Sequence, residues 1–420
     1  MTLKGLDKYR SFYTNNRILG RKISGSLILL TIAAICQFAG DFLFTKFLSP
    51  QDIASYFNFR SYFLIFSSFV LVGNGTSIVR EKTLDRRYVV ICSSLQNFAL
   101  SIITTVIYCF FFLKQPDYFI YYLLGLIVYS HTRVIFAIKQ SEKKINSSIY
   151  YSEFWRVILL VLFLAFYAFN GHKVTFPYLV MITIISFYAV IFDLVKSVFL
   201  LFRSSINVLF DRDNFKKLYG FGYLFFIFGL TLNASIFIDQ LIVTTYLDPK
   251  ISANYIAHIT LFMSPLLFLN KFMTSFAAPY LRDDHKGIVS GIRKKLPLVI
   301  WGFVLLMILC YVASYVGFKV FYAKKYELVL SLTFFIWFTG ILRILYIFPS
   351  AIVGMRGTKS ELHSFLTGNV VGLLVQVVLS AIGIYYFKAE ALLFVIWAML
   401  INWIIRLFSG FSNIVKIMRR

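Results

Sequence analysis

The chain of 420 residues carries 42 Lys and Arg against 18 Asp and Glu, a formal net charge of +24, yet only 14% of its residues are charged and 59% are hydrophobic. Soluble domains have about 25% charged residues, so the composition excludes a soluble enzyme and predicts a protein surrounded by lipid. The basic residues are spread over many short connectors rather than gathered in one patch, which excludes a nucleic-acid-binding protein.

Twelve apolar stretches follow one another from about residue 23 to the C-terminus. Each reaches the roughly 20 residues with which a helix crosses about 30 Å of hydrocarbon. The sequence therefore predicts an all-α polytopic membrane protein. The predicted transmembrane helices are 24–48, 56–79, 88–113, 118–136, 148–170, 175–195, 219–246, 252–278, 296–318, 327–350, 362–386 and 390–412.

Lysine and arginine are concentrated in alternate connectors. One side of the predicted membrane, which includes both chain ends, holds 28 of them and the other side holds 8. The positive-inside rule then places both termini in the cytoplasm. The first apolar run is too long for a cleaved signal peptide, so we expect a multi-pass protein of a bacterial plasma (inner) membrane with an uncleaved first helix.

The two halves of the chain share a sequence pattern. Leu-x-Pro-x-x-x-Ala-x-Tyr begins at Leu48 and again at Leu247, an offset of 199 residues, and the aspartates upstream, Asp41 and Asp239, are 198 residues apart. Six predicted spans separate the copies, so the halves have the same orientation and are parallel repeats. We predict two six-helix lobes, residues 1–205 and 206–420, that rock against each other in alternating access.

Three segments carry a resemblance to a known family: "FLSPQDIASYFNF", "VLVGNGTSIVR" and "FKKLYGFGYLFFIFGLTLNASIFIDQLIV". With the helix pattern, they make the chain similar to the polysaccharide-transporter branch of the multidrug/oligosaccharidyl-lipid/polysaccharide (MOP) exporter superfamily. The nearest kind is the Wzx-like flippase for O-antigen or capsule repeat units. The resemblance covers essentially the whole chain and rests on no catalytic motif.

This resemblance implies a V-shaped arrangement of two six-helix lobes around a central cavity. The implied cargo is undecaprenyl-pyrophosphate-linked oligosaccharide, moved from the inner to the outer leaflet. Membrane lipids, a polysaccharide polymerase and chain-length machinery are the further partners that it implies.

Two other functions stay open at this point. One is a multidrug or small-solute antiporter of the same fold. The other is a membrane polysaccharide polymerase, which generally needs a large external domain, whereas the predicted external connectors here have only about 5 to 11 residues.

No motif for enzyme or cofactor chemistry stands out. The chain has no phosphate-binding loop of the Gly-x-x-x-x-Gly-Lys-Ser/Thr type, and its five histidines show no ligand-spaced pair. Asp211-Arg-Asp213 lies in a connector too short to belong to a sugar-nucleotide transferase domain. We therefore expect no enzyme activity, no cofactor and no metal site.

Charges inside the predicted spans are the best pointers to function, because each costs roughly 2.5–3.5 kcal/mol to insert unless it faces protein or water. The basic ones are Arg60, Arg133, Arg156, Lys271, Arg343 and Arg406, and the deeply placed acidic ones are Asp41, Glu153 and Asp239. A pyrophosphate cargo favours Arg and Lys, whereas cationic drugs favour unpaired carboxylates. The excess of bases favours an anionic substrate.

The individual residues allow different interpretations. Arg60, Arg133 and Arg406 lie near predicted span ends, from which they can snorkel to lipid headgroups. Glu153 and Arg156, three residues apart on one helix face, either neutralise each other or line the cavity.

Lys271 and Arg343 lie about seven residues from the predicted cytoplasmic ends and have no opposite charge three or four residues away. The predicted substrate-cavity residues are Arg156, Lys271, Arg343 and Glu153. Asp41 and Asp239 are candidates for proton or ion coupling, with a structural cap or an interlobe hydrogen bond as the alternative.

Overall fold

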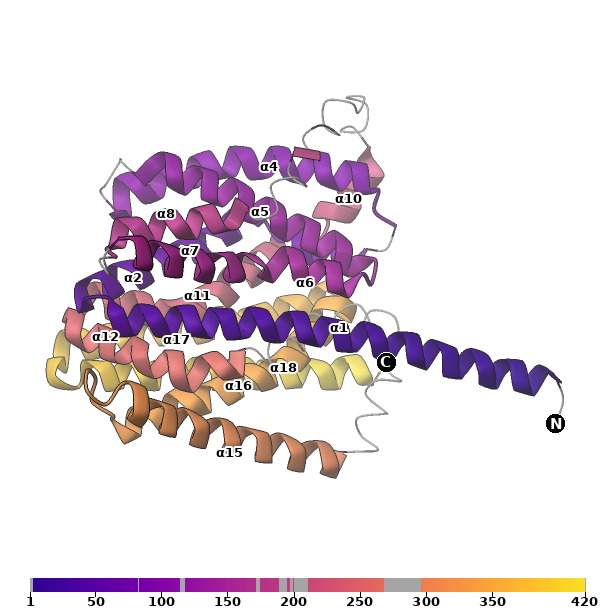
Figure 1. Ribbon diagram of the computed structural model, residues 1–420. Coiled ribbons are helices and arrows are strands. Elements are labelled where there is room, and N and C mark those ends of the chain that lie inside the picture. Colours follow the sequence, from indigo (N-terminus) through magenta and orange to yellow (C-terminus); the bar gives the residue numbers. More distant parts are fainter. Residues whose placement is uncertain are drawn as a thin grey trace.

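The computed structural model describes residues 3–81, 83–113, 118–170, 174–188, 195–196, 199, 211–267 and 296–419. Every regular element within these ranges is a helix, which confirms the predicted all-α class. Figure 1 shows the helices running roughly along one direction, with the first half of the chain (indigo to magenta) lying above the second half (orange to yellow). Both chain ends lie at the same end of the bundle.

The helices of the first half are α1 (Leu3–Phe47), α2 (Pro50–Leu71), α3 (Asn74–Arg80), α4 (Arg86–Ile107) with the π-helical η1 (Tyr108–Leu113), α5 (Phe119–Ser141), α6 (Ile145–Glu153), α7 (Trp155–Phe169) and α8 (Phe176–Phe187). Those of the second half are α10 (Arg212–Tyr219), α11 (Gly222–Tyr246), α12 (Pro249–His258) with the π-helical η5 (Ile259–Met263), α15 (Leu296–Phe321), α16 (Leu330–Arg356), α17 (Lys359–Tyr386), the short η6 (Lys388–Glu390) and α18 (Ala391–Met418).

Each of the twelve predicted spans contains helix. Nine helical segments in the described residues are long and apolar enough to cross a membrane, and the bent pair α2 and α3 makes a tenth. The remaining two predicted spans, 175–195 and 252–278, are described only in part, as α8 and as α12 with η5. The predicted lobe boundary between residues 205 and 206 falls outside the described residues.

The prediction of one unbroken helix over 56–79 is wrong. α2 ends at Leu71, α3 begins at Asn74, and the two axes differ by 54°. Val72 (φ 44°) and Gly73 (φ 74°) have left-handed backbones between them. A Cβ atom at Gly73 would lie 2.5 Å from the backbone nitrogen of Phe226 in α11. Glycine therefore allows both the break and the close approach of the second half.

The repeated sequence pattern forms the start of a helix in each half. Ser49 caps α2 and Asp248 caps α12, each accepting a hydrogen bond from a backbone N–H of the first turn. The proline of the pattern occupies the first helical position, where its fixed φ fits and its missing N–H is not needed. The tyrosines that close the pattern, Tyr56 and Tyr255, are both buried.

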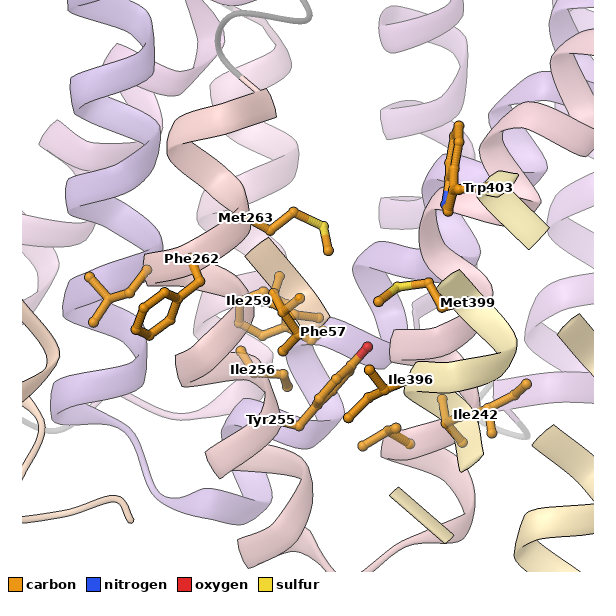
Figure 2. Packing of buried hydrophobic residues seen from close by; sticks show 14 of the residues in the cluster. Phe57, Ile242, Tyr255, Ile256, Ile259, Phe262, Met263, Ile396, Met399 and Trp403 are labelled. Carbon is orange, nitrogen blue, oxygen red and sulfur yellow. The ribbon is translucent and has the colours of Figure 1, made fainter. Parts of the chain in front are cut away.

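The two halves share one apolar core. α2 packs along α11, and α12 packs against α2 and α1. The largest cluster of buried residues draws Phe44 and Phe57 from the first half and Tyr255 and Trp403 from the second. Figure 2 shows Phe57 among Tyr255, Ile256 and Ile259. Apolar burial therefore holds the halves together in their inner part, while α15 exposes most of its length.

Small residues let α17 and α18 approach each other closely. Gly368 and Gly372 are four residues apart on one face of α17, and a methyl group at Gly372 would lie 2.5 Å from Oδ1 of Asn402 in α18. This small-x-x-x-small spacing is typical of tightly packed membrane helices. It brings the polar side chains of both helices together inside the second half.

Candidate functional site

The charged residues of the predicted spans lie largely inside the protein. Exposed fractions are 7% or less for Arg156, Arg343, Arg406, Asp41, Glu153 and Asp239. Arg60 and Arg133 are half-buried. Lys271 lies outside the described residues. Away from the span ends, the described spans thus hold five arginines against three deeply placed carboxylates, distributed over both halves.

Asp41 of α1 is paired with Arg60 of α2. Nη1 of Arg60 lies 2.6 Å from Oδ1 of Asp41, and the Arg60 guanidinium lies 4.8 Å from the centre of the Phe57 ring. Arg60 therefore points to an internal carboxylate. The pair joins two neighbouring helices just inside the end where α1 turns into α2.

Glu153 and Arg156 form an ion pair where α6 ends and α7 begins. The predicted neutralising contact is present, but it satisfies only part of the guanidinium, because Nε of Arg156 has no hydrogen-bond partner among the described residues. Arg156 is also near enough to Arg133 and Arg60 to be repelled by them, and near enough to Asp41 to be attracted by it. The first half thus gathers three arginines and two acids in one region.

The second half holds a three-residue cluster of Asp239, Tyr255 and Arg343. The Tyr255 hydroxyl donates to Oδ2 of Asp239 at 2.6 Å, and Nη2 of Arg343 lies 3.9 Å from Oδ1 of Asp239. All three side chains are almost fully buried. Tyr255 ends the repeated sequence pattern and Asp239 is its upstream aspartate, so the repeat itself builds two thirds of the cluster.

Arg343 has poor partners for its other donors. Its Nη1 donates to the sulfur of Met263 at 2.9 Å and its Nη2 to the sulfur of Met399 at 3.4 Å, while Nε has no partner among the described residues. Figure 2 shows these two methionines pointing toward each other from η5 and α18. Thioether sulfur is a weak acceptor. The guanidinium therefore keeps much of its capacity for a stronger one.

The π-helical turn η5 helps to place Met263. A π-helical turn adds a residue to the helical repeat and is frequent at functional sites. The Ser314 hydroxyl of α15 donates to the carbonyl of Leu261 at 2.6 Å and fixes this turn.

Arg406 is fully buried, so the prediction that it snorkels to headgroups is wrong. The helix continues beyond the predicted span to Met418, which places Arg406 about three turns from its end. Its Nε donates to Oδ1 of Asn402 at 3.1 Å and its Nη2 to the carbonyl of Thr231 at 2.7 Å. Trp403 lies between two buried arginines of this half, and the centre of its ring is 5.0 Å from the guanidinium of Arg343 and 5.3 Å from that of Arg406.

The repeat-related aspartates have different arginine partners. Arg60 lies on α2, in the second predicted span of its half, whereas Arg343 lies on α16, in the fourth predicted span of its half. Sequence comparison of the halves finds Asp41, Asp239 and the tyrosines, but it gives no sign of Met263, Met399 or Trp403. These residues look like ordinary apolar positions until packing brings them to Arg343.

The chemistry of this interior is that of charge and hydrogen bonding. Within the described ranges, no three His, Cys, Asp or Glu side chains gather in a way that could hold a metal ion. What the arrangement supplies is a set of buried guanidinium groups, some with weak or missing partners, next to two repeat-related carboxylates.

Comparisons with known proteins find similarity in structure. No family model and no curated protein sequence matches the chain. A mutant of the Vibrio cholerae MATE transporter VcmN matches with a TM-score of 0.65 and 13% identity over 97% of this chain and 98% of that one. A MATE transporter in complex with MaL6 matches with a TM-score of 0.63 and 14% identity over 95% and 97%.

A MOP superfamily transporter from Pyrococcus furiosus, described as having a binding pocket of reverse polarity and a different function, matches with a TM-score of 0.59 and 14% identity over 94% and 96%. At these identities the likeness establishes the fold: the chain has the two-lobed, twelve-helix architecture of MOP superfamily transporters.

Proposed function

We propose that this protein is an alternating-access transporter for an anionic, lipid-linked cargo, in particular an undecaprenyl-pyrophosphate-linked oligosaccharide repeat unit. The observation that carries the proposal is Arg343, a buried guanidinium whose donors face two thioethers and a carboxylate 3.9 Å away. The sequence resemblance supports the sugar and lipid parts of the proposal, and the fold supports the transport mode.

The arginine chemistry fits a phosphate-bearing cargo. A guanidinium binds phosphate oxygens through two parallel, charge-assisted hydrogen bonds, which are roughly twice as strong as neutral ones. An arriving oxyanion would replace the sulfurs of Met263 and Met399 as acceptor at Arg343. The bond between Arg343 and the cargo would be of moderate strength, because Asp239 competes for the same guanidinium. Moderate strength suits a transporter, which must also release its cargo.

The first half contributes to the same proposal. Arg156, with Glu153 as its only close carboxylate among the described residues, adds positive potential beside Arg133 and Arg60. Lys271 remains a predicted cavity residue. Together these groups give the interior an excess of positive charge that would attract a pyrophosphate while the lipid tails stay outside.

Asp41 and Asp239 are the proposed coupling residues. Each is a buried carboxylate held by an arginine, and Asp239 also accepts from Tyr255. Protonation of either would weaken its ion pair and free the arginine. Loading of a proton and release of the cargo contact would then be linked through the same side chain.

A multidrug or small-solute antiporter is the second candidate. The MATE transporters among the solved structures support it at least as well as they support the flippase, and buried carboxylates suit cationic drugs. The distinguishing feature is the sign of the interior charge, five arginines against three deeply placed acids in the described spans.

The polymerase hypothesis receives less support. Two residues join α1 to α2, two join α11 to α12, and four, residues 387–390 with η6 among them, join α17 to α18. Connectors of this size at the end opposite to the chain termini offer little room for a two-substrate active site.

The test is deletion of the gene in its host, followed by analysis of lipid-linked intermediates and surface glycan. We expect lipid-linked repeat units to accumulate on the cytoplasmic leaflet. Single units that reach the outside without lengthening would indicate a polymerase. Unchanged surface glycan with increased sensitivity to cationic drugs would indicate the antiporter.

Complementation then tests the site. At matched expression, Arg343→Ala should restore little surface glycan, whereas Lys416→Ala, which removes an exposed charge from α18, should restore it fully. Full activity of Arg343→Ala would refute the role given to this arginine.

A further inference from the structure

One cation of each half reaches into the other half and binds the C-terminal carbonyls of a helix there. Lys325, in the connector between α15 and α16, donates through Nζ to the carbonyls of Thr45 (2.9 Å), Lys46 (3.1 Å) and Leu48 (2.7 Å) at the end of α1. The Tyr326 hydroxyl adds a bond to the Thr45 carbonyl at 2.7 Å. We call this set of bonds the external latch, after the predicted side of the membrane.

A matching arrangement with the roles reversed lies at the opposite end. Arg80, the last residue of α3 in the first half, donates through Nη1 to the carbonyl of Gly354 (3.0 Å) and through Nη2 to that of Gly357 (2.9 Å), at the end of α16. The guanidinium lies 4.3 Å from the centre of the Phe221 ring. We call these bonds the cytoplasmic latch.

Each latch uses the same physical attraction. The last carbonyls of a helix have no partner within the helix and carry the negative end of its dipole, so a cation placed there is favourable. In both latches the capping cation comes from the other half of the molecule. Separating the halves at either end would therefore leave a helix end uncapped.

α16 connects the two latches. It begins five residues after Lys325, ends at the carbonyls that Arg80 binds, and carries Arg343 between these points. Its ends are thus fastened to the first half at opposite sides of the bundle. If the halves rock as rigid bodies, separating them at one end brings them closer together at the other end, so the latch at that other end stays closed.

We propose that the external and cytoplasmic latches are the two gates of this transporter, and that Lys325 and Arg80 set the balance between its outward-open and inward-open states. The proposal rests on the alternating access in the proposed function. The latches differ in the bonds that join the halves: Lys325 has three carbonyl acceptors in the first half, whereas Arg80 has two in the second half. Arg356 of the second half repels Arg80, and the attraction of Arg80 to Glu81 stays within the first half and does not join the halves. The external latch is therefore the tighter gate, and the inward-open state is favoured in the absence of cargo.

Distance measurements between spin labels on the two halves test this directly in the purified full chain in lipid nanodiscs. Labels at Ala168 and Lys388 report on the external end, and labels at Ser147 and Ser360 report on the cytoplasmic end; all four positions are exposed. The four native cysteines are replaced in this background.

Lys325→Gln should increase the population with separated external labels about tenfold, because it removes a charged donor from three acceptors. Arg80→Gln should instead separate the cytoplasmic labels. The double variant should bring both distributions back toward those of the native chain. Lys324→Gln, an exposed neighbour, and Arg86→Gln, whose ion pair with Glu142 lies within the first half, are the matched controls.

The proposal would be overturned if Lys325→Gln and Arg80→Gln separated the labels at the same end of the molecule. It would also be overturned if neither variant changed the label distances more than the control variants do. Lys325→Arg retains a charged donor and should behave like the native chain, which guards against a variant that merely folds poorly. Because the measurement needs no cargo, the gates can be upheld even if the cargo proves to be a drug rather than a glycan.

Discussion

Asp239 and Arg343 face each other inside the second half at 3.9 Å between Oδ1 and Nη2, and neither side chain is more than 1% exposed. A pair sealed from water in this way depends on both members. Removing one member leaves a buried charge without solvent or counter-charge, whereas replacing both members leaves no unpaired charge from this pair in the interior.

Arg343→Met should therefore destabilise the protein by roughly 3–5 kcal/mol, and Asp239→Asn combined with it should recover most of that loss. Tyr255 can still donate to the amide oxygen at position 239 in the double variant. Unfolding in mixed micelles with increasing SDS measures both. Arg60→Met provides the comparison: its pair with Asp41 is 18% exposed on the arginine side, so the loss should be smaller. Equal losses in single and double variants would mean that the two charges do not interact.

The geometry of Arg343 can be separated from its charge. Arg343→Lys keeps the positive charge but loses the planar fork that binds two phosphate oxygens. If the cargo binds through a phosphate at this position, transport should fall roughly tenfold or more relative to the native chain, in an assay of lipid-linked glycan flipped into proteoliposomes. Near-native transport by Arg343→Lys, together with loss in Arg343→Met, would indicate that only the field of the charge matters.

The contact between α17 and α18 predicts a sharp difference among glycines. Gly372→Ala would place a methyl group 2.5 Å from Oδ1 of Asn402 and should destabilise the protein by about 1–3 kcal/mol. Gly302→Ala in α15 has no atom within 4 Å of the new methyl group and should be neutral or slightly stabilising, because alanine favours helix. Thermal unfolding followed by intrinsic fluorescence compares them. A neutral Gly372→Ala would show that α18 can move away without loss.

The start of α10 should be sensitive to acid. Asp211 accepts hydrogen bonds from the backbone N–H groups of Asn214 and Asp213, and these hold the pKa of its carboxyl group below the usual value. A lowered pKa means that the capping contribution is complete above about pH 4 and is lost as the pH falls below that. Hydrogen exchange of peptides that cover α10 should show this loss in the native chain. Asp211→Asn should remove the pH dependence and keep part of the cap.

The predicted order of the helices followed directly from the sequence, because an apolar run of sufficient length in lipid has few alternatives to a helix. The repeat pattern lies at the start of α2 and of α12, and the aspartate and tyrosine that it picks out in each half are buried. The break at Val72 and Gly73 was missed, although the sequence VGNG contains the glycine, because only the approach of α11 shows that the backbone must turn there.

The partners of the buried charges could not be predicted in the same way. Arg343 meets Asp239, Met263 and Met399 across four helices, and which faces of those helices meet is decided by packing rather than by hydropathy. Arg406 was misplaced for a simpler reason. The predicted span ends at residue 412, which puts Arg406 near a helix end, whereas the helix continues to Met418.

The close contact between α17 and α18 also bears on how the chain enters the membrane during synthesis. Arg406 alone would make the insertion of α18 unfavourable, yet the carbonyl of Asn369 in α17 accepts from its guanidinium at 3.4 Å. Gln376 of α17 accepts from the side-chain amide of Asn402, whose oxygen in turn accepts from Arg406. Only four residues, 387–390, join the two helices. The last two helices are therefore suited to leave the translocon as one hairpin, with Arg406 already shielded by its neighbour.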